Sequence, residues 1–378
     1  MIPLIYGLAP IHLPSFFYLD LIVRGRVLPK GRYKGEPISI IIPCHNEETV
    51  IGNTLKALLK LRKRIKKLEV IVVDDGSTDH TFEVASSFKT KHKDLELKVL
   101  KKEDGGKGKS WAVNFGIENA TYDIICVLDA DSRPYLRSLE YLVPYLKAKR
   151  VAAACGIIKV RNKKVNWLTE LVSFEYNIAN YIQWKKSMID SYIPWMPGTI
   201  TLIKKQLAKF PPSLVEDAEL SAKLIEEGYV IIVDKRAAAS EVAPTTLKAY
   251  LRQRIRWSRG NWSLLKYYRN KKMLLNYLLT FFERIQPALT TISYILFGWG
   301  LYSRHYTIDF ILTPLWCFSL IVISLIYRQS IKEFKEKYSI KTYFIYFFIS
   351  SFLYLLIWFR SLFPIKGWYK TKRVKDYY

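Results

Sequence analysis

Short runs of β-branched residues alternate with stretches of helical character between residues 36 and 244. Each apolar run ends in polar residues, which is typical of strands buried on both faces of a largely parallel sheet. This alternation predicts an α/β domain over residues 36–244. The predicted strands are Ile38–Ile42, Val70–Val73, Ile124–Leu128 and Val230–Val233, and the clearest predicted helices are Thr49–Leu61 and Ser138–Lys147.

Long uncharged segments lie near both ends of the chain. Ile285–Tyr302, Phe310–Tyr327 and Thr342–Phe359 are each about 18 residues long, close to the ~20 residues that cross the bilayer core as a helix. Tryptophan and tyrosine near their ends favour membrane spans over buried core helices. Met1–Leu19 is also apolar, but three prolines interrupt it, so both a span and an interfacial segment stay open.

The charge of the chain narrows the class of partner. Its 378 residues include 59 Lys and Arg against 33 Asp and Glu, a formal net charge of +26. Basic clusters at residues 24–34 and 332–341 place those loops in the cytosol by the positive-inside rule, while the side of the basic tail stays open. The charge suits anionic lipid head groups or nucleotides. No nucleic-acid-binding motif accompanies it, so we expect no nucleic-acid partner.

Composition excludes two other classes of protein. Half of the residues are hydrophobic, which excludes an intrinsically disordered chain. The four cysteines are scattered, which excludes a disulfide-built secreted scaffold.

Carboxylates follow two of the predicted strands, where open α/β sheets bind their ligands. Asp129 and Asp131 are separated by one residue, so in extended backbone both side chains point to the same side. They suit Mg²⁺ or Mn²⁺, and a capped turn is the alternative explanation of the pattern. Asp75 is placed to hydrogen-bond a base or ribose. Ser77 or Thr78 is expected to cap the next helix.

A glycine-rich segment, Gly105–Lys109, precedes a predicted helix start at Ser110–Gly116. Glycine backbone, a helix N-terminus and two lysines favour a phosphate group, and a flexible surface loop is the alternative. The segment lacks the Walker A spacing. The first strand lacks G-x-G-x-x-G after it, which argues against a dinucleotide enzyme.

Two further clusters carry candidate chemistry. Glu216 and Asp217 open a predicted helix, where a carboxylate is either a dipole partner or a base for an acceptor hydroxyl. Residues 247–268 form a basic, aromatic stretch with an apolar stripe, which predicts an interfacial helix. Within it, Arg256 is suited to a diphosphate and Trp257 to stacking on a sugar, while attraction of the arginines to lipid head groups is the alternative.

In this order, the motifs resemble the membrane-bound family 2 glycosyltransferases, the group of cellulose, hyaluronan and poly-N-acetylglucosamine synthases. The resemblance implies a cytosolic GT-A domain (Rossmann-like, mostly parallel sheet) at 36–244, an interfacial helix at 245–272 and a transmembrane region at 273–378, after an N-terminal membrane segment and linker at 1–35. The matching segments are Pro43–Glu47, Asp74–Ser77, Gly108–Lys109 with Ala112–Asn114, Asp129–Asp131, Pro197–Thr199, Glu216–Asp217 and Gln253–Trp257.

The resemblance also implies a role for each matching residue, with a UDP-sugar as donor and Mg²⁺ or Mn²⁺ as cofactor. The enzyme would be a multi-pass protein of the cell membrane that inverts the anomeric centre. The implied roles are uridine contact for Glu47 and Asp75; nucleotide-sugar binding for Lys109, Asp129, Gln253 and Arg256; metal binding for Asp131 with Asp129; catalysis for Glu216 and Asp217, with Asp217 as general base; and acceptor binding for Trp257, Gly198 and Thr199.

Some features depart from the family pattern. Val215 replaces the usual threonine before Glu-Asp, and Pro197 replaces a frequent cysteine. The chain is short for building a polymer channel. Polysaccharide synthesis is therefore the first hypothesis, and transfer of one sugar to a membrane lipid, as in ceramide glucosyltransferases, or to a polyprenyl phosphate is the second. A non-catalytic membrane protein with a nucleotide- or lipid-binding domain is a third.

Overall fold

A computed structural model describes residues 31–101, 105–188, 195–262 and 324–363, together with residues 264, 295, 298, 299, 302, 321 and 322. The predicted N-terminal segment Met1–Leu19 lies outside the described residues. So do the basic tail and most of the runs Ile285–Tyr302 and Phe310–Tyr327.

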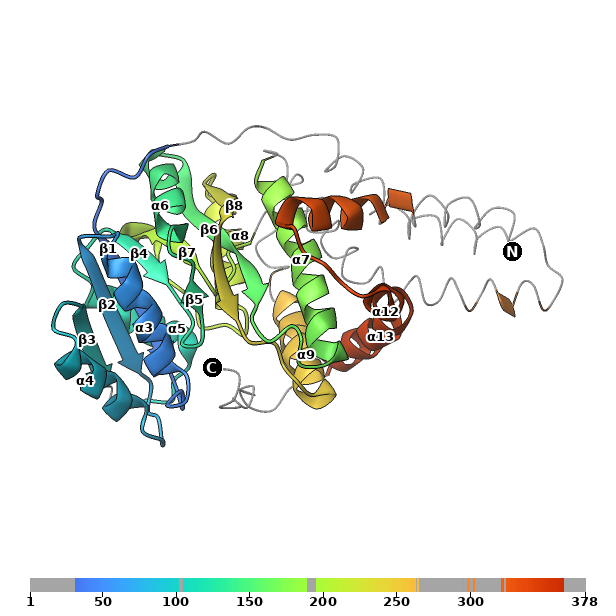
Figure 1. Ribbon diagram of the computed structural model, residues 1–378, viewed down its shortest axis with the longest axis horizontal. Helices are drawn as coiled ribbons and strands as arrows, with labels where there is room; N and C mark the ends of the chain where they lie inside the picture. The colour runs from blue at the N-terminus through green and yellow to red at the C-terminus, as the bar shows by residue number, and fades with distance from the viewer. Residues whose placement is uncertain are drawn as a thin grey trace.

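The described residues form an eight-stranded sheet in the order β3-β2-β1-β4-β7-β6-β8-β5 (Figure 1). The pairs β3-β2, β2-β1, β1-β4 and β6-β8 are parallel, and the pairs that involve β7 or β5 are antiparallel. The α/β class and the mostly parallel sheet are confirmed. The strands are β1 (Ile38–Cys44), β2 (Leu68–Asp74), β3 (Glu96–Lys101), β4 (Ile124–Val127), β5 (Arg133–Pro134), β6 (Val151–Val160), β7 (Thr201–Lys204) and β8 (Val230–Glu241).

Helices flank the sheet and continue beyond it. The first helix begins two residues later than predicted, and the predicted helix Ser138–Lys147 divides into α6 and a 3-10 helix, Val143–Lys147. A second 3-10 helix is Lys205–Leu207, and a π-helix, Ile345–Ile349, joins α12 to α13. The α-helices are α3 (Ile51–Arg62), α4 (Thr81–Lys91), α5 (Lys109–Glu118), α6 (Ser138–Leu142), α7 (Trp167–Ser187), α8 (Glu216–Glu226), α9 (Leu247–Trp262), α12 (Ile340–Phe344) and α13 (Ser350–Ser361).

The expected capping of α4 by Ser77 or Thr78 is wrong. His80 occupies the N-cap position and makes no side-chain cap hydrogen bond. The Ser77 hydroxyl donates to the Asp74 carboxylate instead. Asp79 accepts the Thr81 N–H at 3.0 Å and so satisfies one of the free donors at the start of the helix.

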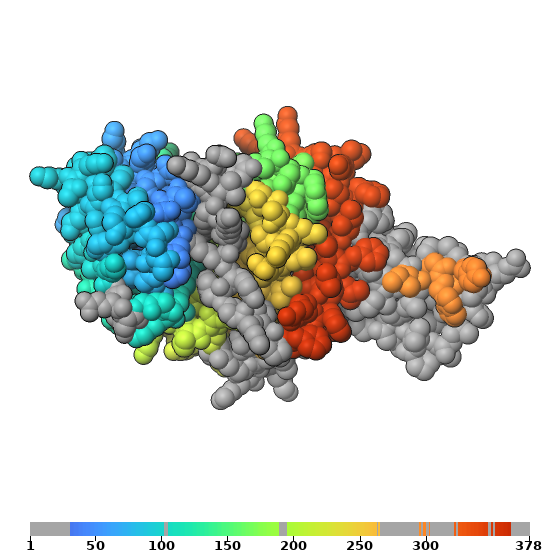
Figure 2. Space-filling view, turned by 90° about the horizontal axis from the view of Figure 1, so that it is seen from below, coloured from blue at the N-terminus to red at the C-terminus, as the bar shows by residue number. Residues whose placement is uncertain are grey.

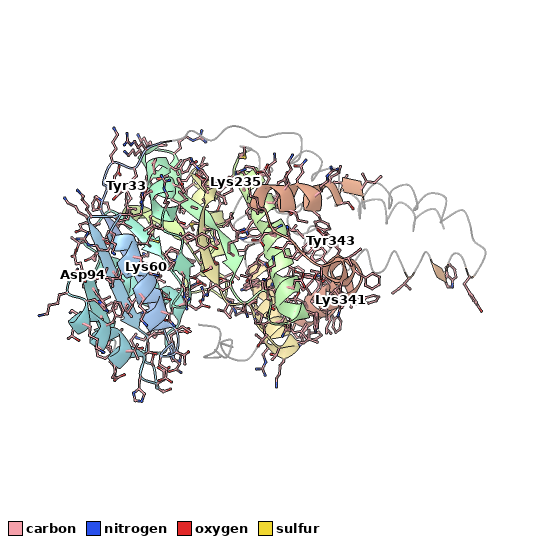
Figure 3. All side chains as sticks on the ribbon, in the orientation of Figure 1. Tyr33, Lys60, Asp94, Lys235, Lys341 and Tyr343 are labelled. Atoms are coloured by element: carbon pink, nitrogen blue, oxygen red, sulfur yellow. The ribbon has the colours of Figure 1, made fainter. Side chains whose placement is uncertain are left out.

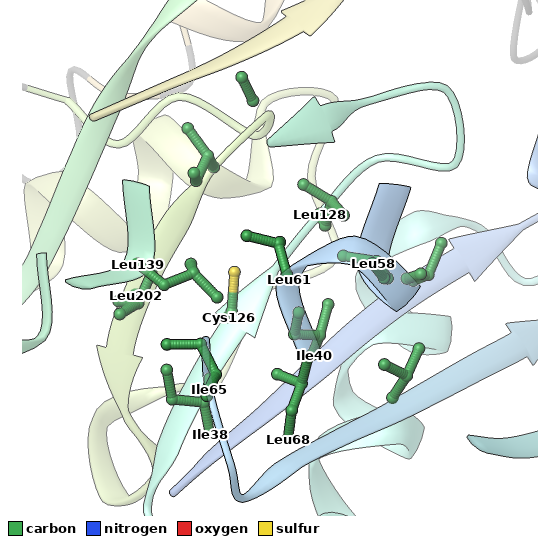
Figure 4. Close-up of a cluster of buried hydrophobic side chains, with 14 of the residues drawn as sticks. Ile38, Ile40, Leu58, Leu61, Ile65, Leu68, Cys126, Leu128, Leu139 and Leu202 are labelled. Carbon is green, nitrogen blue, oxygen red and sulfur yellow. The ribbon is translucent and has the colours of Figure 1, made fainter. Parts of the chain in front are cut away.

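Both faces of the central strands are buried. On one face, side chains of β1, β2 and β4 pack against α3 in a cluster that includes Ile38, Ile40 and Leu58 (Figure 4). On the other face, Ile41 and Ile71 pack with side chains of α5. Burial on both faces explains the unbroken apolar runs in these strands, because neither set of side chains meets water.

Four helices, α7, α9, α12 and α13, gather at the β6–β8 side of the sheet (Figure 1). Figure 2 shows α9, in yellow, beside the red surface of α12 and α13, and α13 packs against α9. Lysines such as Lys60 of α3 and Lys341 of α12 lie on the outer surface (Figure 3). Within the part of the chain that the structure describes, no helix combines the length and apolar character needed to cross a membrane.

Candidate active site

A cavity of about 880 Å³ opens at the carboxyl ends of β1, β2 and β4, and extends to α7, α9 and α13. Parallel strands share one edge of a sheet, so the loops that follow them converge on the same place. Every predicted site residue lines this cavity. They are Glu47, Asp75, Lys109, Asp129, Asp131, Gly198, Thr199, Glu216, Asp217, Gln253, Arg256 and Trp257.

Asp75 holds the glycine-rich loop at the mouth of the cavity. Its Oδ1 accepts the N–H groups of Gly106 at 2.8 Å and Lys107 at 3.2 Å, and its Oδ2 accepts that of Gly108 at 2.8 Å. Gly105 is required here, because a Cβ on it would lie 2.4 Å from the backbone nitrogen of Gly76. The Asp75 carboxylate, which was predicted to contact a base or ribose, therefore also holds the glycine-rich loop in place.

The loops after β1 and β2 are tied to each other. Asn46 adopts a left-handed backbone with φ of 57°, and its Oδ1 accepts the Thr78 N–H at 2.7 Å. The His45 Nδ1 lies 2.8 Å from the Asp75 carbonyl oxygen. Glu47 is buried, and its N–H donates to Thr81 Oγ1 at 2.7 Å. These contacts place Glu47 and Asp75 on neighbouring walls of the cavity.

Asp129 and Asp131 lie in a turn, which is the alternative to extended backbone that the sequence left open. Strand β4 ends at Val127, and the Ser132 N–H donates to the Asp129 carbonyl at 2.9 Å. Both side chains nevertheless line the cavity. The two carboxylates therefore face the same cavity, as predicted, but they do so from a turn.

Lys109 is the counter-ion that the sequence did not assign to this acidic group. Its Nζ lies 2.6 Å from Asp129 Oδ1 and 3.2 Å from Glu216 Oε1. Burial lowers the pKa of this lysine, but the charges of Asp129, Glu216 and Asp217 raise it well above its usual range. Lys109 is therefore a fixed positive charge that joins the start of α5 to the start of α8.

Asp217 is placed to act as a proton acceptor. Burial and the charge of Glu216 raise the pKa of its carboxyl to about 6, although Lys109 opposes the shift. Its Oδ1 accepts the Ala218 N–H at 2.8 Å, which fixes the carboxylate at the start of α8. A base with a pKa near the working pH suits general base catalysis.

Gly198 lets the backbone approach these charges closely. A Cβ at this position would lie 2.9 Å from Lys109 Nζ, 3.1 Å from Asp217 Oδ2 and 3.6 Å from Asp129 Oδ2. The side chains of the site therefore leave little room for any residue other than glycine.

Replacing Gly198 by alanine is expected to displace Lys109 and Asp217 and to lower the activity of this site by about 10²-fold. Parallel measurements of catalytic rate and thermal unfolding check this expectation. Gly52→Ala in α3 is the control for the loss of a glycine, since a Cβ there meets only Val84 Cγ1, at an ordinary contact distance of 3.6 Å. Full activity in Gly198→Ala would show that the close approach has no role.

Glu241 is a cavity residue that the sequence analysis missed. Its Oε2 accepts the Thr199 hydroxyl at 2.8 Å. Burial and the charge of Asp131 raise the pKa of its carboxyl to about 7. The residue ends β8, which is predicted from sequence only as far as Val233. Because the predicted strand stopped at Val233, Glu241 was not recognised as a carboxylate at a strand end.

The acidic group fits a divalent cation. Burial raises the pKa of Asp129, and although Lys109 opposes the shift, the neighbouring charge of Asp131 adds to it, so these carboxylates repel each other in one cavity. Hard oxygen ligands suit Mg²⁺ or Mn²⁺, which commonly take one or two carboxylates and complete their shell with substrate phosphates. Among the described residues, no three carboxylates, histidines or thiols are arranged around one point.

Helix α9 covers the start of α8. A Cβ on Gly260 would lie 2.5 Å from Val215 Cγ1, so the Val215 side chain packs directly on the backbone of α9. Arg256 donates from Nη1 to the Leu214 carbonyl at 2.8 Å. These contacts bring Arg256 and Trp257 to the cavity beside Asp217.

Arg254, which the sequence analysis did not select, anchors α9. Its Nη2 lies 2.7 Å from Glu175 Oε2 of α7, and both side chains are buried. The Tyr250 hydroxyl donates to Glu175 Oε1 at 2.6 Å. Arg254 also donates to Gln253 Oε1 at 2.9 Å, and its guanidinium lies 4.4 Å from the Trp257 ring. The buried ion pair thus orients two cavity residues.

Comparison with known proteins shows which family the chain resembles and which fold it has. The family model described as Glycosyl transferase family 2 matches residues 39–207, and that described as Glycosyl transferase family group 2 matches residues 124–363. Among solved structures, the mannosyltransferase PcManGT from Pyrobaculum calidifontis, in complex with GDP-Man and Mn²⁺, has a TM-score of 0.65 at 19% identity. The match covers 88% of this chain and 99% of that one. The fold is therefore GT-A-like.

Curated relatives agree with the family models. The "Probable glycosyltransferase YdaM" of Bacillus subtilis (strain 168) is 30% identical over 395 residues, which cover 93% of this chain and 91% of that protein. The "Poly-beta-1,6-N-acetyl-D-glucosamine synthase" of Staphylococcus epidermidis is 31% identical over 267 residues, covering 66% of this chain but only 61% of that protein. The chain belongs to glycosyltransferase family 2 and is an enzyme of that family.

Proposed function

We propose that the enzyme transfers a sugar from a UDP-sugar to a growing polysaccharide, with inversion at the anomeric carbon. The observation that carries the proposal is the convergence of Asp75, Lys109, Asp129, Asp131 and Asp217 on one cavity. The relative named as a polysaccharide synthase supports the acceptor class. The solved relative with the similar fold holds GDP-Man, so the donor screen includes guanosine nucleotides.

The site supplies each element of a direct displacement. An acceptor hydroxyl attacks the anomeric carbon, the bond to the departing diphosphate breaks, and the hydroxyl proton passes to Asp217. The positive charges of Lys109 and Arg256 offset the charge that grows on the diphosphate. Mg²⁺ or Mn²⁺, held by Asp129 and Asp131, would add Lewis-acid stabilisation of that group. An α-linked donor thus gives a β-linked product.

The first test incubates membranes that contain the full chain with a panel of UDP- and GDP-sugars, and measures product mass and length. A ladder or smear on a gel is expected for polysaccharide synthesis. A product with one added sugar on a lipid would overturn the polymer proposal and support single-sugar transfer. The absence of turnover with every donor would overturn the proposed donor class.

Activity is expected to depend on pH through Asp217. Only the deprotonated carboxylate accepts a proton, and its raised pKa is about 6. The turnover number should therefore be nearly constant above pH 7 and fall about tenfold per unit below pH 6. Rates measured from pH 4.5 to 8 with saturating donor check this profile. Constant rates down to pH 5 would argue against a base of this pKa.

We also propose that the catalytic domain faces the cytosol at the cell membrane. Support comes from an apolar face that stays exposed along α12 and α13, formed by Ile340, Phe344, Phe352, Leu356 and Phe359. Large exposed apolar faces of this kind suit a lipid surface. Such contact would also serve the second hypothesis, transfer to a membrane lipid. Replacing Phe352 and Leu356 by aspartate should weaken vesicle flotation, and unchanged flotation would argue against contact through this face.

A further inference from the structure

The cavity is larger than its catalytic wall. Beyond the acidic group, it is lined by Gln183 of α7, by Trp195 in the segment after α7, and by Tyr354 and Trp358 of α13. Tyr354 and Trp358 are four residues apart and share one face of their helix. None of these side chains has a role in the displacement described above.

Gln183 presents an unsatisfied donor on this wall. The side chain is 7% exposed, and its Oε1 accepts the Trp195 N–H at 3.0 Å. Its Nε2 has no hydrogen-bond partner among the described residues. Asn180, one turn earlier, differs, because its amide bonds both the N–H and the carbonyl of Ile158, at 3.0 and 2.7 Å. Buried amide donors are rarely left without an acceptor, so Gln183 indicates a ligand.

Trp358 presents a second such donor from another helix. Its Nε1 is buried and has no acceptor within the described part of the chain. An indole N–H and an amide NH₂ only donate, so the ligand that satisfies them must supply acceptor oxygens. The tryptophan and tyrosine rings on the same walls add flat apolar surfaces.

The charges on this side favour a neutral ligand. Arg254 lines the cavity, but it is already paired with Glu175, and Tyr354 donates to the same Glu175 at 3.3 Å. A phosphate ligand there would lie near the negative charge of Glu175, and Arg254 could not bind it because Arg254 is already paired with Glu175. A molecule with many uncharged oxygens and apolar ring faces can accept hydrogen bonds from Gln183 and Trp358 and can also pack on the aromatic rings. Carbohydrate has this chemistry.

We propose that the α7 and α13 walls of the cavity bind the acceptor as a carbohydrate chain, with Gln183 Nε2 and Trp358 Nε1 donating to different oxygens of that chain. This inference rests on the proposed function and extends that function, because the α7 and α13 walls would bind an acceptor of several sugars. It predicts that a pentasaccharide binds better than a single sugar.

The test measures binding to the purified full chain by calorimetry, without turnover. The probes are pentasaccharides of β-1,6-linked N-acetylglucosamine, β-1,4-linked glucose and mannose, the matching monosaccharides, dodecyl phosphate, and UDP with Mn²⁺. At least one pentasaccharide should bind ten times or more tightly than its monosaccharide. Gln183→Glu keeps the oxygen that accepts from Trp195, and Trp358→Phe keeps an aromatic ring. Each should weaken that binding about tenfold, with UDP affinity unchanged.

Matched controls are Gln206→Glu and Trp167→Phe, since both residues are exposed and lie outside the cavity lining. Unchanged pentasaccharide affinity in both cavity variants would overturn the inference. Failure of every pentasaccharide to bind, or tighter binding of dodecyl phosphate, would also overturn it. If UDP binds normally in those cases, the proposed use of a UDP-sugar survives, and the length of the product decides the acceptor. Loss of both UDP and pentasaccharide binding in the unaltered chain would overturn the proposed function as well.

Discussion

Replacing Asp217 by asparagine is expected to lower the turnover number by about 10²–10⁴-fold, with donor affinity nearly unchanged. Asparagine keeps the shape of the side chain but cannot accept the proton of an attacking hydroxyl. The Asp217 carboxylate is buried in the cavity, next to the Lys109 charge and within reach of the Gly198 backbone. Initial rates with a saturating donor, together with donor affinity measured separately, check this expectation.

The matched control is Glu226→Gln, at the exposed end of the same helix. It removes one carboxylate from α8 without touching the cavity, and we expect the activity of the unaltered chain. A fall of less than about tenfold in Asp217→Asn would remove this residue from the role of base. Glu216→Gln then becomes the next variant, because Glu216 is the neighbouring carboxylate at the start of α8 and also faces Lys109.

Replacing Arg254 by methionine is expected to cost about 3–5 kcal/mol of unfolding free energy, because it leaves the Glu175 charge buried without its partner. The pair joins α7 to α9, and Tyr250 and Tyr354 both donate to the same carboxylate. The hydrogen bond that Arg254 donates to Gln253 Oε1 is lost as well. Activity should therefore fall together with stability. Thermal unfolding of the full chain in detergent, with turnover measured at a lower temperature, checks both effects.

The double variant Arg254→Met with Glu175→Leu separates charge from packing. It removes both charges, so most of the lost stability should return, while Gln253 and Trp257 stay without their anchor and activity stays low. Arg64→Met is the surface control, since Arg64 is exposed and its partner Glu140 keeps a second ion pair with Arg137, and we expect little change in the unfolding midpoint. An equally small effect of Arg254→Met would contradict the anchoring role.

The parts of the fold that local sequence determines were predicted well. Strands β1, β2 and β4 are runs of β-branched residues, and their observed bounds differ from the predicted ones by at most two residues. The strand-end motifs could be assembled into one site from sequence because parallel strands end at a common edge. Their order along the chain then identified the family, which the family models confirm.

Other features depend on contacts between distant segments. Strand β6 contains three consecutive alanines and no strong strand signal, and it is held by its neighbours β7 and β8. Helix α7 buries polar side chains such as Glu175 and Asn177, which hides its apolar face in the sequence. The Lys109 ion pairs join residues far apart in the chain. Glu241 was missed because β8 continues eight residues past its predicted end.

Metal-dependent nucleotide binding tests the central claim most directly, because the claim is that Asp75, Asp129 and Asp131 jointly hold a metal-chelated nucleotide. Calorimetry with the full chain should show UDP or GDP binding that requires Mn²⁺ or Mg²⁺ and weakens at least tenfold in Asp131→Asn. Absence of nucleotide binding with either cation, or equal affinity in Asp131→Asn, would contradict the account.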